Sequence, residues 1–161
     1  MNYDYKPINS ETPWDFRKTV NIQNLKIEYK QMIEVCQGGP CVGNLYINDV
    51  EIQSGKMFGG PFLMSGECLY IPLFVRKFST TGFQLFCWNL TKQTFLIGTQ
   101  ILPLIRLDRI DGDEIHYSIG NKMSDKKITL ISEFLNYTPS LQRKDHSSQN
   151  WIIFILLLNL M

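Results

Sequence analysis

Residues 59–98 read GGPFLMSGECLYIPLFVRKFSTTGFQLFCWNLTKQTFLIG, and this stretch decides the class of fold. Between Leu69 and Arg76, aliphatic residues alternate with other types, which is the period-two pattern of a strand with one aliphatic face. Pro72 interrupts that strand and has no amide hydrogen to donate to a neighbour, so the pattern predicts an edge position or a bulge there. The double glycine and proline at 59–61 are typical of a tight turn. The stretch therefore predicts antiparallel hairpins.

The same turn occurs earlier, as Gly38-Gly39-Pro40. Each occurrence predicts a Gly-Gly-Pro turn, a short strand, a second turn at a glycine, and a strand beginning near Leu-Tyr-Ile; the second glycine is Gly43 in one unit and Gly66 in the other. Before the first unit, residues 25–35 alternate as a strand does, although apolar residues at helical spacing also occur there. The alternation favours a strand over a helix, ending at the Gly-Gly-Pro turn.

Regularly spaced hairpins follow the central stretch. Asp111-Gly112-Asp113 is a strong turn signal between two of the runs. The further strands predicted are Phe83–Leu90, Thr94–Thr99, Leu104–Ile110, Ile115–Ile119 and Ile128–Phe134. We expect an all-β fold, an antiparallel meander of roughly nine to eleven short strands forming a twisted sheet or a sandwich. The hairpins resemble those of β-propeller blades, but the chain is too short for a ring of such blades.

Composition supports one folded domain. The chain has 161 residues, 44% of them hydrophobic, and a formal net charge of +1. We expect a single domain over 1–161, with a polar lead-in at 1–18, a β-rich core at 19–138 and a tail at 139–161. The absence of alanine, the best helix former, also argues against an all-helical fold. Because the net charge is nearly zero, Arg76, Lys77, Phe78, Arg106 and Arg109 do not predict direct nucleic-acid binding.

The termini bear on the compartment. The first residues lack a basic region followed by an apolar one, so no secretory signal is predicted and we expect a cytoplasmic protein with four reduced cysteines. Residues 151–161 are almost wholly apolar but number only eleven, against about 20 for a membrane-spanning helix. We expect no membrane span. A buried strand is favoured over a membrane-surface or tail-anchor role, and an altered or disordered tail is the third alternative.

No pattern predicts catalysis, a metal or a cofactor. Only Cys36 and Cys41 are close in sequence, whereas structural zinc sites bring their ligands as two close pairs. His116 and His146 are the only histidines, and no nucleophile motif surrounds either of them. The prolines of the Gly-Gly-Pro turns also remove an amide that a phosphate loop would use. We therefore expect a protein that is not an enzyme, although a hydrolase site assembled from distant residues is an alternative.

An acidic stretch is the best candidate for partner binding. It lacks the alternating acids and the distal glutamate of a calcium-binding EF-hand loop, so a hairpin turn with an exposed acidic corner is favoured. Aromatic residues are frequent anchors of protein interfaces, and an exposed tryptophan would complete such a contact. The predicted partner-binding residues are Asp108, Asp111, Asp113, Glu114 and Trp88.

Residues 36–120, with their Gly-Gly-Pro turns and the stretch at 59–98, resemble small bacterial immunity proteins of contact-dependent growth inhibition and related polymorphic toxin systems. The resemblance implies an antitoxin that binds one cognate protein toxin and blocks its active site or its access to substrate. Immunity proteins against nucleases are often strongly acidic, and this chain is not, so the resemblance does not specify a nuclease. The alternative function is a small-ligand or carbohydrate-binding β module, for which an aromatic-lined groove would be needed.

Overall fold

The computed structural model describes residues 3–120 and 125–135. These residues form thirteen strands, all paired antiparallel, and one four-residue helix, α1 (Ile131–Phe134). The predicted all-β, antiparallel class is confirmed. The strand count exceeds the expected nine to eleven because several strands have only two to four residues, such as β5 (Val50–Glu51).

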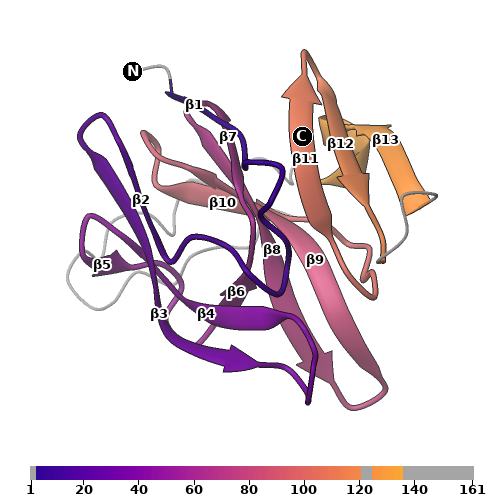
Figure 1. The fold of residues 1–161 in the computed structure, drawn as a ribbon. Coiled ribbons are helices and arrows are strands. Elements are labelled where there is room, and N and C mark those ends of the chain that lie inside the picture. The colour runs from indigo at the N-terminus through magenta and orange to yellow at the C-terminus, as the bar shows by residue number, and fades with distance from the viewer. Residues whose placement is uncertain (1–2, 121–124, 136–161) are drawn as a thin grey trace, which may run out of the picture.

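Ten strands make up the main sheet (Figure 1). They are β1 (Tyr3–Tyr5), β2 (Thr19–Ile22), β3 (Leu25–Glu34), β4 (Cys41–Ile47), β5, β6 (Met57–Gly59), β7 (Leu63–Gly66), β8 (Cys68–Lys77), β9 (Thr80–Asn89) and β10 (Thr94–Ile97). The sheet branches at β8: β9 pairs along its whole length on one side, whereas β7 and β6 share the other side. From β7 the sheet continues to β1, and from β6 through β4 and β3 to β2. The result is a nearly closed, barrel-like sheet.

A second sheet packs on the outside of this barrel. It consists of β11 (Arg106–Asp111), β12 (Glu114–Ser118) and β13 (Lys126–Leu130). Side chains from this sheet, including Leu107 and Ile115, share a buried cluster with Leu85 of β9. The molecule therefore has two cores, an inner core inside the barrel and an outer core between the barrel wall and the second sheet.

The strand pair β8 and β9 separates the two cores. Leu69, Ile71 and Leu73 face the inner core, and Tyr70 faces the outer core. Successive side chains of a strand point to opposite faces, so a wall with a core on each side needs apolar residues at nearly every position. This explains why the sequence there is more continuously apolar than a strand with one solvent face.

The expectation of an edge position or a bulge at Pro72 is wrong, because the register with β9 runs without irregularity through this residue. The residue pairs with Leu85 of β9, and β8 lies in the interior of the sheet. On its other side, β7 pairs with residues up to Tyr70 and β6 begins to pair at Leu73. Pro72 thus lies between the part of β8 that pairs with β7 and the part that pairs with β6. No strand pairs with Pro72 on that side, so the amide hydrogen that proline lacks is not needed there.

The first Gly-Gly-Pro unit differs from the prediction in one respect. The turn does separate β3 from β4, but Gly43 lies within β4 instead of forming a second turn. Its neighbour β3 has a register irregularity between Lys30 and Ile33, and a Cβ atom on Gly43 would lie only 2.6 Å from the sulfur of Met32. Glycine is needed there for close approach of the bulged strand.

The predicted strand Ile128–Phe134 is correct only in its first half. Strand β13 ends at Leu130, which pairs with Glu114, the first residue of β12. Because β12 offers no residue before Glu114, the ladder ends there and the chain turns into α1, and Phe134 stacks on Tyr117 with ring centroids 4.5 Å apart. The hairpin turn at residues 111–113 is confirmed.

The segment before β2 is tied into the barrel. Strand β1 pairs with β7, and Phe16 packs in the inner core. Within the described residues, no helix is long and apolar enough to cross a membrane. The predicted tail at 139–161, with His146 and Trp151, lies outside the described residues.

Candidate functional site

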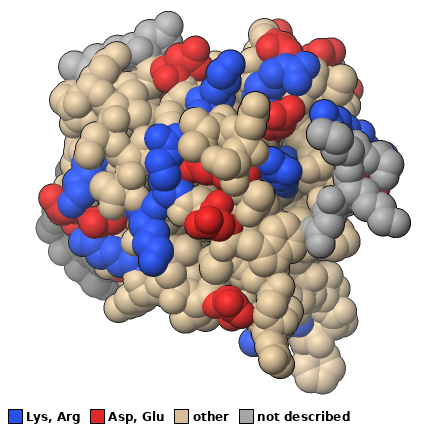
Figure 2. All heavy atoms as spheres, viewed as in Figure 1, with Lys and Arg blue, Asp and Glu red and all other residues tan. Residues whose placement is uncertain are grey.

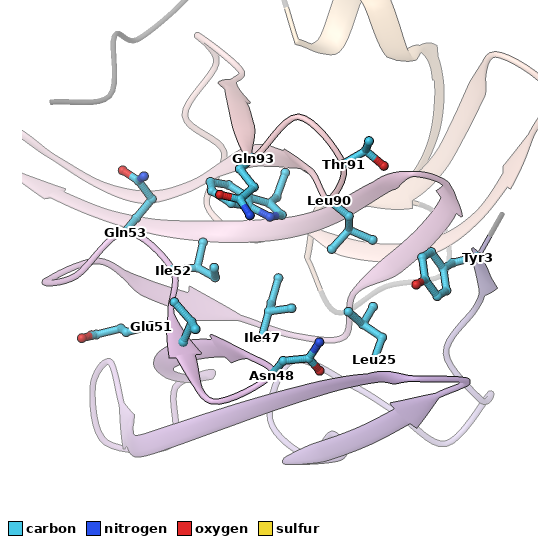
Figure 3. Close-up of a pocket in the computed structure, with 12 residues that line it drawn as sticks. Tyr3, Leu25, Ile47, Asn48, Glu51, Ile52, Gln53, Leu90, Thr91 and Gln93 are labelled. Atoms are coloured by element: carbon cyan, nitrogen blue, oxygen red, sulfur yellow. The ribbon is translucent and has the colours of Figure 1, made fainter. Parts of the chain in front are cut away.

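A pocket of about 560 Å³ opens at one end of the barrel-like sheet (Figure 3). It lies among β1, the start of β3, the β4–β5 hairpin with the residues that follow it, and the end of β9 with the turn to β10. Its size is within the range of sites that hold small organic ligands, about 300–1,000 Å³. The mouth of a barrel is also a common place for such sites.

The floor of the pocket is apolar. Its residues belong to the inner core or pack against it, and they are Leu25, Ile47, Ile52, Trp88 and Leu90. Leu25 and Ile47 reach the pocket from β3 and β4, whereas Ile52 and Leu90 follow the ends of β5 and β9, as the close-up in Figure 3 shows. Since these side chains are held by the surrounding core, the floor exists before any ligand arrives.

The β4–β5 hairpin shapes one wall. Its two turn residues, Asn48 and Asp49, have φ values of 48° and 65°, the left-handed pair that a tight two-residue hairpin requires. The Lys26 amide donates a hydrogen bond of 2.8 Å to Oδ1 of Asn48, and Nζ of Lys26 lies 3.0 Å from Oδ1 of Asp49. These contacts fix the hairpin to β3 and place Val50 and Glu51 beside the pocket.

The rim is polar but carries little charge. Its residues are Tyr3, Asn48, Glu51, Gln53, Thr91 and Gln93. Glu51 is the one residue among those lining the pocket that bears a formal charge, and its Oε1 accepts a hydrogen bond of 2.6 Å from Nδ2 of Asn44. A rim of amides and hydroxyls with one carboxylate suits a neutral ligand with polar groups at one end, and disfavours an anion.

This pocket was not predicted from the sequence. Its single usable signal was the Asn-Asp pair between two apolar runs, which is typical of a two-residue hairpin. Nothing local indicated that Tyr3, Leu25 and Trp88 would meet, because pairing across the sheet brings them together.

The predicted acidic residues lie on the second sheet. The side chains of Asp108 and Asp111 both contact Arg109, with Nη1 of Arg109 3.4 Å from Asp108 Oδ2 and Nε 2.8 Å from Asp111 Oδ2. Asp113 and Glu114 are exposed and make no ion pair with any residue that the structure describes. The hairpin therefore brings the four acidic residues together. Among the described residues, only the charges of Asp113 and Glu114 lack an ion-pair partner.

Trp88 does not belong to this surface, and the expectation that it is exposed is wrong. Its side chain is only 6% exposed and lies in the inner core, with its ring 6.4 Å from that of Phe95. The alternation of β9 places Phe86 and Trp88 on the inner face, whereas Leu85 and Cys87 face the outer core. Trp88 is instead part of the pocket floor.

His116 sits on β12, and its side chain is 12% exposed. Its Nε2 lies 3.1 Å from Oδ2 of Asp111, but the contact lacks hydrogen-bond geometry, and no hydroxyl or thiol of the described residues is hydrogen-bonded to that nitrogen. No group of three or more potential ligands in the described ranges is placed to hold a metal ion.

Charges of both signs are interspersed on the face of the molecule seen in Figure 2. Several Lys and Arg side chains lie next to one another left of centre on this face, with Asp and Glu side chains beside them. Comparison with models of known protein families, with curated protein sequences and with solved structures finds no significant match.

Proposed function

We propose that this chain is a non-catalytic binding protein that holds a small, neutral, largely apolar molecule in the pocket at the open end of the barrel. The observation that carries the proposal is a cavity of about 560 Å³ with a buried apolar floor and a polar rim. The floor has no titratable group, which suits binding by exclusion of water from apolar surface.

The expected affinity sets the scale of the experiment. A neutral probe such as N-phenyl-1-naphthylamine has about 17 heavy atoms, and at about −0.3 kcal/mol per atom it would bind with about −5 kcal/mol. This corresponds to a Kd of about 0.2 mM, so the protein concentration in the titrations should reach the millimolar range. The fluorescence of the probe rises when it moves from water into apolar surroundings, which gives a direct signal.

Substitution of Val50 by tryptophan is expected to weaken probe binding at least about tenfold, because Val50 lines the pocket and is exposed enough to accept a large ring without disturbing the core. Ile33→Trp is the matched control: Ile33 is also an exposed β-branched residue in a strand, away from the pocket. An anionic analogue that adds a sulfonate should bind at least about tenfold more weakly than the neutral probe, because of Glu51.

Equal affinity in the Val50→Trp and Ile33→Trp proteins would show that the probe binds elsewhere and would remove the pocket from consideration. Absence of any saturable signal at millimolar protein would likewise count against the proposal.

We propose a second candidate function, neutralisation of a protein toxin, on a separate observation. The exposed carboxylates of Asp113 and Glu114 have no ion-pairing partner within the described part of the chain and stand at a hairpin turn. Such unpaired charge is available to a basic surface on another protein, where it would contribute to specificity and to the rate of association.

The unaltered chain is used to capture proteins from extracts of the cells that make it. A double variant, Asp113→Asn with Glu114→Gln, is expected to fail to capture one of these proteins, while its thermal unfolding stays nearly unchanged. The matched control, Asp4→Asn with Asp15→Asn, removes the same charge from exposed positions elsewhere. Identification of captured proteins by mass spectrometry provides the measurement. An identical set of partners for both variants would exclude this surface.

A further inference from the structure

The indole nitrogen of Trp88 is the only polar side-chain atom in the floor of the pocket, since the other floor residues are aliphatic. The Trp88 side chain is 6% exposed, and its Nε1 makes no hydrogen bond with any residue that the structure describes. The N–H group of a buried tryptophan usually has a hydrogen-bond partner. Trp88 therefore carries a buried donor for which the protein provides no acceptor.

Comparable groups elsewhere in the molecule do have acceptors. Nε1 of Trp14 donates a hydrogen bond of 3.0 Å to the carbonyl oxygen of Gly38. In the inner core, the buried hydroxyl of Tyr29 donates one of 3.0 Å to the carbonyl oxygen of Gly59. The fold thus supplies backbone acceptors to other aromatic side chains with a polar tip, and Trp88 is an exception.

The N–H group of Trp88 opens into the pocket. Within the described ranges, Nε2 of His116 is the one fully enclosed side-chain polar atom without a partner, so Nε1 of Trp88 borders open space. Because the core encloses the rest of the side chain, this space is the pocket that Trp88 lines. Gln53 and Gln93 line the same pocket (Figure 3), but no hydrogen bond joins either side chain to Trp88. The acceptor must therefore come from whatever fills the pocket.

We propose that the pocket selects neutral carbonyl compounds with an apolar body, and that the carbonyl oxygen accepts a hydrogen bond from Nε1 of Trp88. The proposal rests on the ligand-binding function proposed above and names the chemical class of the ligand. A ligand without an acceptor would remove water from the indole N–H and leave a buried donor unpaired, which is costly. A site with such a donor therefore discriminates against the analogue that lacks the oxygen.

Two other kinds of acceptor fit the pocket less well. An anionic oxygen is disfavoured by the carboxylate of Glu51 at the rim. A hydroxyl oxygen can accept from Trp88, but the side chains of the floor contain no acceptor for the proton of that hydroxyl. A carbonyl oxygen only accepts hydrogen bonds, so a ketone, an ester or a tertiary amide satisfies Trp88 without adding an unpaired donor.

Benzophenone and 1,1-diphenylethylene form a matched pair of probes, because they share two phenyl rings and differ only in C=O against C=CH₂. Each has about 14 non-hydrogen atoms, for which a Kd of about 1 mM is expected. Equilibrium dialysis of dilute probe against protein up to the millimolar range measures both affinities. Val50→Trp, which narrows the pocket, should weaken the binding of both probes and so show that they occupy it.

Trp88→Phe is expected to weaken the binding of benzophenone about fivefold more than that of 1,1-diphenylethylene. Both probes lose the same apolar contacts in this variant, so the change in the ratio of their affinities isolates the hydrogen bond. Trp14→Phe is the matched control and should leave the ratio unchanged, since the N–H group of Trp14 already donates to Gly38.

A second measurement uses the unaltered chain with nitrogen-15 in its three indole groups. We expect the indole proton of Trp88 to resonate at lower field with benzophenone bound than with 1,1-diphenylethylene bound, because a hydrogen bond to oxygen deshields the proton. The indole proton of Trp14 should have the same shift in both complexes. Trp14→Phe and Trp151→Phe assign the three signals without a change at Trp88.

The predicted change in the affinity ratio together with the predicted NMR difference supports the proposal, and the NMR comparison decides alone if Trp88→Phe does not fold. Equal weakening of both probes in folded Trp88→Phe, or an indole proton at the same field in both complexes, overturns the selection of carbonyl compounds and leaves the ligand-binding function standing. If N-phenyl-1-naphthylamine binds but benzophenone does not, this proposal alone fails. If no probe binds, both proposals fail.

Discussion

The free energy of unfolding of a Phe86→Ala variant is expected to be about 4 kcal/mol lower than that of the unaltered chain. Phe86 is 1% exposed in the inner core, and its ring contacts two others: Phe58 edge-on at 5.1 Å between centroids, and Phe95 in a stack at 5.4 Å. Truncation removes both ring contacts and leaves a cavity in the barrel wall. Urea unfolding followed by far-ultraviolet circular dichroism measures the change.

The chain offers a control for this substitution on the neighbouring turn. Phe78 lies between β8 and β9 and is fully exposed, so Phe78→Ala should change the free energy of unfolding by no more than about 0.5 kcal/mol. Equal losses for the two variants would show that the interior of the barrel is not packed as described.

The second large effect is expected at Glu11, the one buried charged residue among those described, which is 5% exposed. Its Oε1 accepts hydrogen bonds of 3.0 Å from the Arg17 amide and from Nε of Arg17, and its Oε2 accepts one of 2.9 Å from the Ile8 amide. Glu11→Ala leaves these donors without their acceptor, and we expect a loss of about 3 kcal/mol in the free energy of unfolding.

The same carboxylate predicts a pH dependence. Burial by itself would raise the pKa of Glu11, but hydrogen bonds from the Arg17 side chain and from the Arg17 and Ile8 amides outweigh it and hold the pKa below its usual value of 4.5. The unfolded chain therefore takes up this proton first as the pH falls. The stabilisation is complete above the unfolded pKa and disappears as the pH falls through the folded pKa.

Glu11→Gln provides the test, because glutamine keeps the size of the side chain and does not ionise in this range. Unfolding free energies of the two proteins should differ most at pH 7 and converge as the pH falls below 4.5 and through the folded pKa of Glu11. A difference that stays constant from pH 7 to pH 3 would mean that the ionised carboxylate contributes nothing to stability.

Much of the barrel could be predicted because its strands carry local signals. Alternation between Leu25 and Glu34 indicated β3, and glycine-containing turns marked the ends of several hairpins. Local patterns failed where a long-range contact decided the outcome. Gly43 is needed for approach of the bulged β3, and the chain turns helical after Leu130 because β12 offers no further partner.

At the candidate sites, too, local sequence predicted some features and long-range contacts decided the others. The acidic hairpin could be located from Asp111-Gly112-Asp113, because a turn is encoded by the few residues that form it. The roles of its acids depended on Arg109, whose pairing with Asp108 and Asp111 is a matter of side-chain geometry. The face occupied by Trp88 depended on which side of β9 became the interior of the barrel.

By itself, the order of residues determined that this protein is built from antiparallel strands, since period-two alternation and turn residues act within a few positions of each other. Only the tertiary structure decided that β8 has a core on each face and that β7 and β6 share one of its edges. It also decided that Tyr3, Leu25 and Trp88 line one pocket. Pairing between distant strands is selected by the burial of the whole apolar surface, and no short segment carries that information.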